Sequence, residues 1–154
     1  MKDDNAKPPV SKEESFQQAI SRSEEAGRQL LKGDPAPYRQ LYSQRDDVTL
    51  YGGEGGRLQG FAAVSRQLDW IAQQMRHLAV ESVEFEYLVT HVGSEVGYTI
   101  GTQHVWPKDS LSAVSLRVTH IYRYEQDEWR LVHRHGDPHV DMDEKAFERV
   151  YGQT

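Results

Sequence analysis

The sequence predicts one domain of the α+β class, in which helices come first and a curved antiparallel sheet follows. Three observations favour this class. Apolar residues recur at three-to-four spacing in the first half of the chain, and the period changes to two from residue 79 onward. The later strands have no helical segments between them, so we expect neighbouring strands to be antiparallel. The 154 residues suffice for one sizeable core but not for two full domains.

Three helices are predicted in the first half. Residues 1–11 are expected to be a disordered tail, because they hold almost no apolar surface. The first amphipathic helix follows at 12–32, with Ser11 as a candidate N-cap, and a short helix begins at Pro35. The third helix, at 60–76, carries a continuous apolar stripe.

The remaining pattern is that of strands. A short strand at 48–51 ends in the glycine-rich segment 52–56, which we interpret as a hairpin or a loop at a pocket rim, since the Lys-Ser/Thr of a phosphate cradle is missing. Alternating residues predict four long strands at 82–89, 95–106, 112–124 and 128–135. Because Pro138 disfavours further strand, we predict a domain at 12–138 and a C-terminal extension with a short helix at 139–154.

The last hairpin fixes the predicted direction of the side chains. A two-residue turn at Gln126-Asp127 pairs Tyr124 with Trp129 and places His120 opposite His133. One face then carries aromatic and imidazole groups and is expected to point inward; it holds Val118, His120, Tyr122, Tyr124, Trp129, Leu131, His133 and His135. The other face carries Arg117, Arg123, Arg130 and Arg134 around Ile121 and Val132. We expect that face to be hydrated or shared with a second subunit.

The composition excludes several kinds of site. The net charge of −6 argues against a nucleic-acid partner. The chain has no Cys, which excludes disulfides, Cys-ligated zinc, iron–sulfur clusters and thiol nucleophiles. No apolar run approaches the roughly 20 residues of a membrane span, and the first residues lack the apolar stretch of a signal peptide. We therefore expect a cytoplasmic protein with no membrane partner.

Two segments near the end of the chain resemble a known family. Residues 117–123 and 129–135, together with Lys32-Gly33-Asp34 and Tyr38, resemble the SnoaL-like branch of the nuclear-transport-factor-2-like (NTF2-like) superfamily, which is related to ketosteroid isomerase. The resemblance spans roughly residues 24–138. It implies a cone-shaped α+β fold. Because this superfamily holds isomerases, cyclases, hydrolases, dehydratases and inert assembly modules, the resemblance does not define a reaction.

The chain is also similar to the association domain of calcium/calmodulin-dependent kinase II, which shares a Thr-Gln pair at Thr102-Gln103 and a terminal Trp-x-x-Val-His-x-His. The pocket arginines of that domain fall on Ile100, His120 and Gly136. Since none of these is Arg, the resemblance does not carry over an acid-binding pocket; at most a protonated His120 could replace one cation.

The inward face is predicted to line a mostly apolar pocket between sheet and helices. The candidate catalytic residues are His120, His133 and His135. The candidate ligand-binding residues are Ile100, Thr102, His104, Trp106, Val118, Tyr122 and Leu131, the first four on condition that their strand lines the same cavity. We expect a small hydrophobic organic molecule as the ligand, with no cofactor and no metal.

The histidine cluster has three interpretations. The imidazoles could line the pocket, each with one hydrogen bond. They could serve as general acid and base, oriented by Asp137 or Tyr122. They could also bind a divalent metal through three nitrogens, although only Asp137 is near enough to support such ligands.

Two classes of function follow. In the first, the protein is a SnoaL-like isomerase, cyclase or hydrolase that uses His120 or His133 as a general base and needs no organic cofactor. In the second, it is a non-catalytic ligand-binding or oligomeric assembly module, like the kinase association domain. In both, we expect a homodimer formed through the outer face of the sheet.

Overall fold

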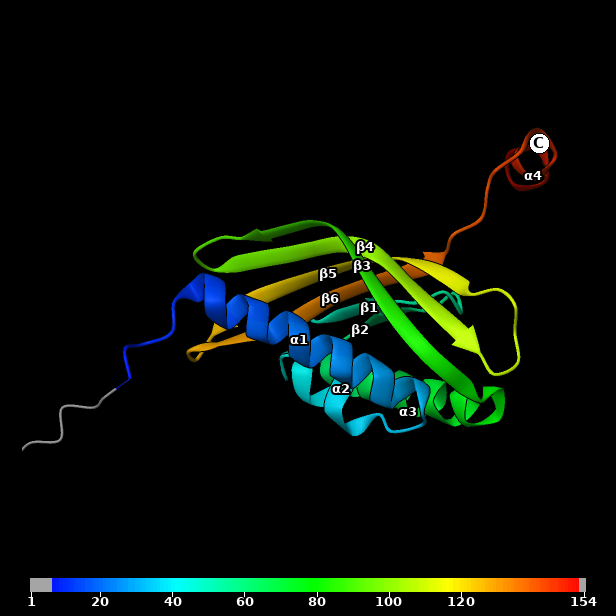
Figure 1. Ribbon diagram of the computed structural model, residues 1–154. Helices are drawn as coiled ribbons and strands as arrows, with labels where there is room; N and C mark the ends of the chain where they lie inside the picture. Colours follow the sequence, from blue (N-terminus) through cyan, green and yellow to red (C-terminus); the bar gives the residue numbers. More distant parts are fainter. Residues whose placement is uncertain (1–6, 153–154) are drawn as a thin grey trace, which may run out of the picture.

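The computed structural model describes residues 7–152, in which four helices accompany a six-stranded sheet (Figure 1). The helices are α1 (Lys12–Leu31), α2 (Ala36–Leu41), α3 (Phe61–Leu78) and α4 (Glu144–Tyr151). The strands are β1 (Thr49–Tyr51), β2 (Arg57–Gln59), β3 (Val80–Val92), β4 (Val96–Pro107), β5 (Val114–Glu125) and β6 (Glu128–Pro138). Residues 1–6 of the predicted tail and the last two residues of the predicted extension lie outside the described residues. No helix within 7–152 is long and apolar enough to cross a membrane.

The strand order is β2-β1-β6-β5-β4-β3. Strands β3 to β6 form the predicted antiparallel meander. The sheet as a whole is mixed, because β1 pairs with β6 in parallel, and in this respect the expectation of a fully antiparallel sheet is wrong. A parallel pair needs a long connection, and α3 with the meander supplies it. The glycine-rich segment 52–56 joins β1 to β2 as a hairpin, although β2 itself was not expected.

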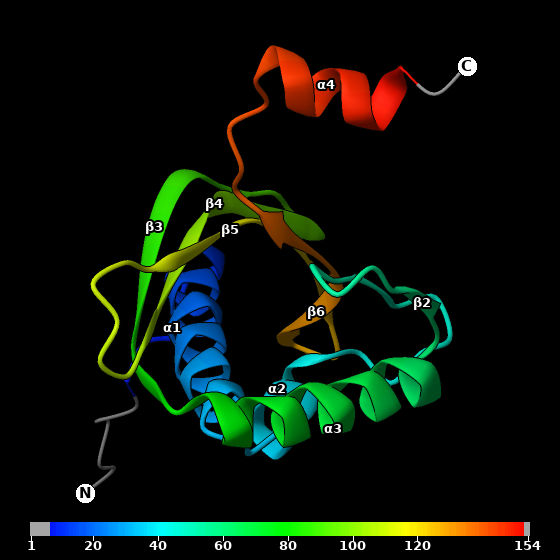
Figure 2. The same ribbon diagram turned by 90° about the vertical axis from the view of Figure 1, so that its right-hand side faces the viewer.

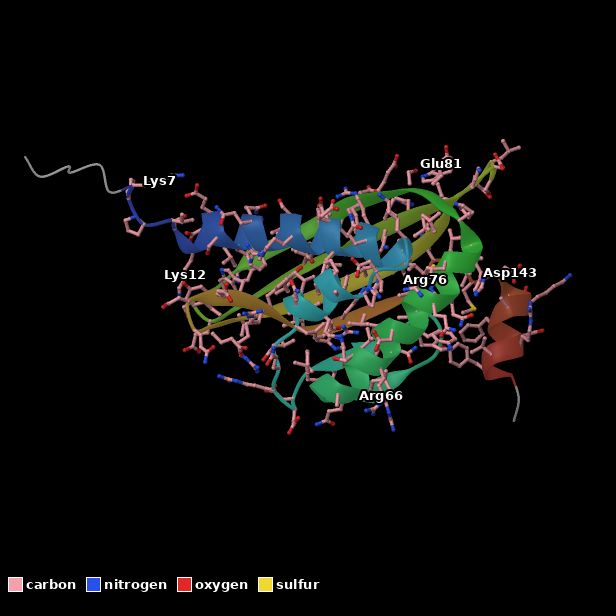
Figure 3. The ribbon with its side chains drawn as sticks, turned by 90° about the horizontal axis from the view of Figure 1, so that it is seen from below. Lys7, Lys12, Arg66, Arg76, Glu81 and Asp143 are labelled. Atoms are coloured by element: carbon pink, nitrogen blue, oxygen red, sulfur yellow. The ribbon has the colours of Figure 1, made fainter. Side chains whose placement is uncertain are left out.

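The two long helices begin and end where the sequence favours it. The Ser11 side chain accepts a hydrogen bond from the Glu14 amide at 3.1 Å, which caps α1. The apolar stripe of α3 is buried through Val64, Leu68 and Ala72. The end of α3 is fixed to the loop after α1, where Arg76 donates to the Gly33 carbonyl at 2.7 and 3.1 Å (Figure 3).

The core lies between α1 and the inner face of the sheet. Phe16 is fully buried and meets the rings of Tyr122 and Trp129 edge-on, with centroids 5.3 and 5.0 Å away. A Cβ on Gly97 would lie 2.7 Å from the Phe16 ring, so glycine lets β4 approach this ring. The predicted pair of Tyr124 and Trp129 is confirmed, with centroids 5.0 Å apart. The sheet is curved around α1 and does not close on itself, because the outer strands β2 and β3 are not paired with each other (Figure 2).

The turn of the last hairpin is the predicted one, but the register beyond it differs. Gln126 and Asp127 both have positive φ, as a tight two-residue turn requires. Tyr122 pairs with Leu131, whereas the preceding residue of β5, Ile121, pairs with His133. Val132 is therefore an extra residue, which marks a β-bulge. The predicted pairing of His120 with His133 is wrong, because His120 lies opposite Arg134.

The bulge also divides the predicted arginine face. Three of the four arginines form ion pairs at the outer surface. These pairs are Arg117 with Asp137 at 2.6 Å, Arg123 with Asp47 at 2.7 Å and Arg130 with Glu128 at 2.5 Å. Arg134 instead enters the interior, where it lines a cavity. A bulge reverses the alternation of inward and outward side chains in one strand. This explains why Arg134 points inward while the other three arginines point outward.

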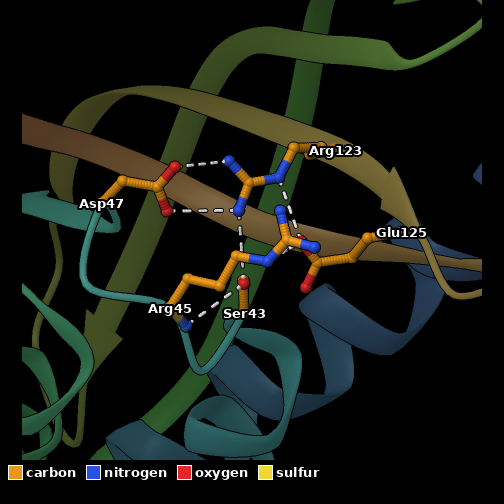
Figure 4. A network of polar contacts seen from close by, with 5 residues as sticks. All are labelled: Ser43, Arg45, Asp47, Arg123 and Glu125. Carbon is orange, nitrogen blue, oxygen red and sulfur yellow. Dashed lines mark hydrogen bonds and ion pairs between the residues drawn. The ribbon is translucent and has the colours of Figure 1, made fainter.

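Arg123 is the centre of the largest of these outer networks (Figure 4). Its guanidinium contacts both carboxylate oxygens of Asp47, the Ser43 hydroxyl and Glu125. The hydrogen bond from Arg123 lowers the pKa of Asp47. The network joins the loop before β1 to the end of β5, so these charged groups are already paired with one another within one chain.

Candidate functional site

A cavity of about 350 Å³ lies between the inner face of the sheet and helices α1 and α3. Most of its wall is apolar and comes from side chains such as Leu30, Leu50, Leu68, Met75, Phe85 and Val105. Its polar side chains are few: those of Ser23, Tyr38, Gln103, His120 and Arg134 are joined in the lining by those of Glu54 and Gln74. Gly53 and Glu54 of the glycine-rich segment also line the cavity, as expected for a loop at a pocket rim. An apolar cavity with a few convergent polar groups is the usual form of a small-molecule site.

Four of the predicted site residues lie on the inner side of the sheet. His120 lines the cavity and is buried. Tyr122 and Leu131 are buried in the adjoining core, and Val118 lines a small second cavity of about 20 Å³ that His120 shares. The structure thus brings together only part of the predicted set.

The other six predicted residues belong to the outer side. In β4 the buried side chains are those of Thr99, Gln103 and Val105, so Ile100, Thr102, His104 and Trp106 alternate to the opposite face, contrary to the condition stated for their strand. Thr102 nevertheless also lines the small second cavity. The His104 Nδ1 lies 2.8 Å from the Ser115 hydroxyl there.

His133 and His135 follow the bulge and are also directed outward. Both rings stand edge-on to Tyr51, with centroids 5.3 and 5.7 Å away, and the Nδ1 of His133 lies 2.7 Å from the Thr49 hydroxyl. The expected inward direction of these two rings is wrong because of the bulge. The three histidines do not converge, and no group of three or more His, Asp or Glu within residues 7–152 could hold a metal ion.

His120 is held between two tyrosines in a chain of hydrogen bonds. The Tyr38 hydroxyl lies 3.0 Å from its Nε2, and the Tyr122 hydroxyl lies 3.4 Å from its Nδ1. Tyr122 also donates to the Ser23 hydroxyl at 3.0 Å, and Ser23 donates to the Ile20 carbonyl at 2.8 Å.

The far end of this chain sets the direction of every proton in it. A carbonyl only accepts, so the Ser23 hydroxyl donates its proton to the Ile20 carbonyl, and the Tyr122 hydroxyl donates its own to the Ser23 oxygen. The Tyr122 oxygen can then only accept from His120, which assigns the proton of the imidazole to Nδ1. Nε2 is left as an acceptor for the Tyr38 hydroxyl. His120 is therefore a neutral imidazole with both nitrogens occupied.

The electrostatics agree with this assignment. Burial lowers the pKa of His120 to about 3, and the nearby Arg134 and His133 act in the same direction. Burial raises the pKa of Tyr38, while the charge and hydrogen bonding of Arg134 act to lower it. With His120 neutral, Arg134 is the one cationic side chain in the lining of the cavity, which also contains the carboxyl group of Glu54.

Arg134 has an incomplete set of partners. Its guanidinium lies 3.1 Å from the Gln103 side-chain oxygen. Within residues 7–152 it forms no ion pair, although nine such pairs occur among other residues. Gly136 leaves space for it, since a Cβ there would lie 2.5 Å from the Arg134 Nη1. Because Arg134 is half-buried in a mostly apolar cavity, water screens its charge less than at the surface, and this favours an anion beside it.

Comparison with known proteins gives the family. The model of the SnoaL-like domain family matches residues 26–140, so the chain belongs to this family. None of the curated proteins matches. Among solved structures, the chain is similar to a calcium/calmodulin-dependent protein kinase type II association domain from Thiobacillus denitrificans, with 17% identity and a TM-score of 0.72 over 86% of this chain and 99% of the other.

Two further structures share the fold. An NTF2-like family protein from Streptomyces avermitilis is 19% identical, with a TM-score of 0.64 over 83% of this chain and 96% of the other. An NTF2-like protein of unknown function from Pseudomonas putida is 18% identical, with a TM-score of 0.66 over 88% and 93%. These likenesses establish the NTF2-like α+β fold.

Sequence reasoning did not assign Ser23, Tyr38, Gln103 or Arg134 to the cavity. Ser23 is one of the regularly spaced apolar or small positions of the first predicted helix, whereas Tyr38 and Gln103 belong to the motifs that carry the family resemblances. Arg134 was assigned to the opposite face. No signal in the sequence marks the bulge that turns Arg134 inward, because Val132 fits a regular strand equally well.

Proposed function

We propose that this protein binds a small, largely apolar organic anion, whose charged group pairs with Arg134 at the inner end of the cavity. The observation that carries the proposal is the inward guanidinium, which is hydrogen-bonded to the Gln103 amide oxygen and forms no ion pair with a carboxylate of residues 7–152. A planar carboxylate matches the fork of N–H donors that arginine presents. The cation comes from position 134, which is none of the positions to which the pocket arginines of the kinase association domain correspond.

The shape and lining of the cavity support an apolar body for the ligand. A volume of about 350 Å³ is at the lower end of the range for small-molecule sites. Aliphatic and aromatic side chains from α1, α3 and β3 surround it away from Arg134. Burying the apolar part of a ligand against them contributes roughly 25 cal/mol per Å² before the costs of association.

The proposed role of His120 is to hold Tyr38 rather than to remove a proton. With both nitrogens hydrogen-bonded and a pKa of about 3, it lacks the near-neutral pKa of an efficient general base. Because His133 and His135 are directed outward, they give no second histidine in the lining of the cavity. We therefore favour ligand binding over an isomerase, cyclase or hydrolase activity based on histidine.

The experiment compares straight-chain carboxylates from hexanoate to decanoate, each with its matching alcohol. Binding is measured by the shift in Tm and by titration calorimetry. We expect each carboxylate to bind more tightly than its alcohol. Charge-assisted hydrogen bonds should make this preference about 1.5–3 kcal/mol. Arg134→Met is expected to remove the preference and to leave the affinity for the alcohol unchanged.

Arg130→Met is the matched control, because Arg130 lies on the same strand but bonds to Glu128 and the Gln40 carbonyl outside the cavity. It is expected to keep the preference for the carboxylate. A wild-type protein that binds alcohol and carboxylate equally, or an Arg134→Met variant that still prefers the carboxylate, would refute the proposal.

We also propose that the chain forms a homodimer through the outer face of the sheet. The corrected basis is apolar rather than cationic: Val89 and Ile100 form a cross-strand pair on that face and are 40% and 38% exposed. Exposed apolar pairs on a broad sheet favour association. The outer arginines already have intrachain partners and contribute less to this proposal than the sequence suggested.

A further inference from the structure

Helix α4 stands apart from the rest of the chain (Figures 1 and 2). It has no buried residue, although Asp143 caps it through a 2.7 Å hydrogen bond to the Ala146 amide. One side of the helix carries Phe147, Val150 and Tyr151, which are 55%, 59% and 63% exposed. Val150 and Tyr151 follow Phe147 by three and four residues, so the three side chains form one continuous apolar face.

Such a helix needs a surface to pack on. Its eight residues are fewer than the roughly 12–15 that an isolated helix needs for marginal stability in water. The opposite side holds Lys145 and Arg149, and the charged residues Glu144 and Glu148 flank the apolar face. A short helix with one apolar and one charged side is the pattern of a helix that covers an apolar surface.

The segment that leads to α4 starts at the rim of the cavity. Pro138, the last residue of β6, lines the cavity, and the His139 amide donates to the Ser115 carbonyl at 2.8 Å. Residues 139–143 then connect to the helix. Five extended residues span about 17 Å, and a helix of eight residues adds about 12 Å. The mouth of the cavity is therefore within reach of α4 of the same chain.

The mouth offers an apolar surface of its own. Trp70, Leu78 and Val114 all line the cavity, yet they are 47%, 57% and 53% exposed. They come from α3 and from the start of β5, so they lie on either side of the opening. Two exposed apolar surfaces joined by a short tether have a high effective concentration for each other.

We propose that α4 is a lid that folds over the mouth of the cavity in its own chain, with Phe147, Val150 and Tyr151 against Trp70, Leu78 and Val114. The role of the lid, which is to slow the release of the bound anion, rests on the function proposed above. The docking of the helix does not depend on a ligand and can be tested without one.

Disulfide trapping tests the docking, because the chain has no native cysteine. Leu78→Cys is combined with Val150→Cys on the apolar face of α4, and in a second protein with Lys145→Cys on its charged face. Oxidation at low protein concentration is followed on non-reducing gels. We expect an intrachain disulfide to form about tenfold faster with the apolar-face cysteine than with the charged-face cysteine.

Either of two results would overturn the lid: equal rates for both pairs, or a disulfide that joins two chains. The second result would assign α4 to a second copy of the chain. Reduced and oxidised forms of the Leu78→Cys, Val150→Cys protein then provide a test of function. Oxidation is expected to slow decanoate release about tenfold, and unchanged release despite a formed disulfide would contradict the lid role alone. If no carboxylate binds either form, the proposed function fails, while the trapping result still decides the docking.

Discussion

The guanidinium of Arg134 occupies the space beside Gly136, where a Cβ atom would lie 2.5 Å from Nη1 and 2.9 Å from Cζ. The two residues are two apart on one face of β6, so the absence of a side chain at one lets the other lie along the strand inside the cavity. The position of the single inner cation thus depends on a glycine.

Gly136→Ala is expected to displace the guanidinium without unfolding the chain. The atoms that a Cβ meets belong to the end of a flexible side chain, which can move away. We expect carboxylate binding to weaken by roughly 1 kcal/mol, or about fivefold in Kd, with little change for the matching alcohol. Gly56→Ala is the control, because its nearest contact would be an ordinary 3.8 Å. Equal losses for alcohol and carboxylate would show that the glycine does not act through Arg134.

The depressed pKa of His120 predicts acid sensitivity. The side chain is neutral in the folded state down to about pH 3, whereas the unfolded chain takes up a proton near pH 6.5. Between these values the unfolded state binds more protons, so the free energy of unfolding falls as the pH falls, by up to about 1.4 kcal/mol per pH unit.

Urea unfolding at several pH values measures this dependence. His120→Gln should reduce the slope between pH 4 and 6.5, and His77→Gln, an exposed residue at the end of α3, should not. The hydrogen-bonded carboxyls of Asp47 and Asp137 also have lowered pKa values. Their contributions to the free energy of unfolding therefore also decrease as the pH falls, but in a lower pH range than the contribution of His120. An unchanged slope in His120→Gln would contradict the buried, neutral imidazole.

Tyr122→Phe tests the directed chain of hydrogen bonds. It removes the donor to Ser23 and leaves the His120 Nδ1 proton without its acceptor. We expect a loss of about 1–3 kcal/mol in the free energy of unfolding, measured in urea. Tyr151→Phe removes the hydroxyl of a tyrosine in α4 that is 63% exposed, and it should change the free energy of unfolding by less than about 0.5 kcal/mol. Equal stability of the two variants would mean that Tyr122 stabilises the fold by packing alone.

Ile100→Glu tests the outer face of the sheet. A charge within an apolar interface is expected to convert the dimer to monomer, which light scattering reads as a halving of the mass. Leu111→Glu is the control, since Leu111 is fully exposed in the loop between β4 and β5. A wild-type monomer, or a dimer that survives Ile100→Glu, would remove this face as the interface.

Local patterns predicted most of the elements. The Ser11 cap, the apolar stripes of α1 and α3, and the positive φ angles at Gln126 and Asp127 each depend on neighbours in the chain. The parallel pairing of β1 with β6 joins residues more than 80 positions apart, such as Thr49 and His133. Nothing in a strand of three residues indicates such a distant partner.

The candidate site was harder to predict, and one residue accounts for the difference. With Val132 in regular pairing, His133 and His135 would face the cavity and Arg134 would face outward. The bulge exchanges them, so His120 is the only predicted catalytic residue that remains in the cavity.

The sequence by itself determined the class of fold, the family and the tight turn of the last hairpin, because periodicity and turn chemistry act over a few residues. The tertiary structure decided which side chains meet in the cavity. A strand alternates with a period of two, so one extra residue reverses the direction of everything beyond it, and packing against β1 and β5 fixes where that residue goes.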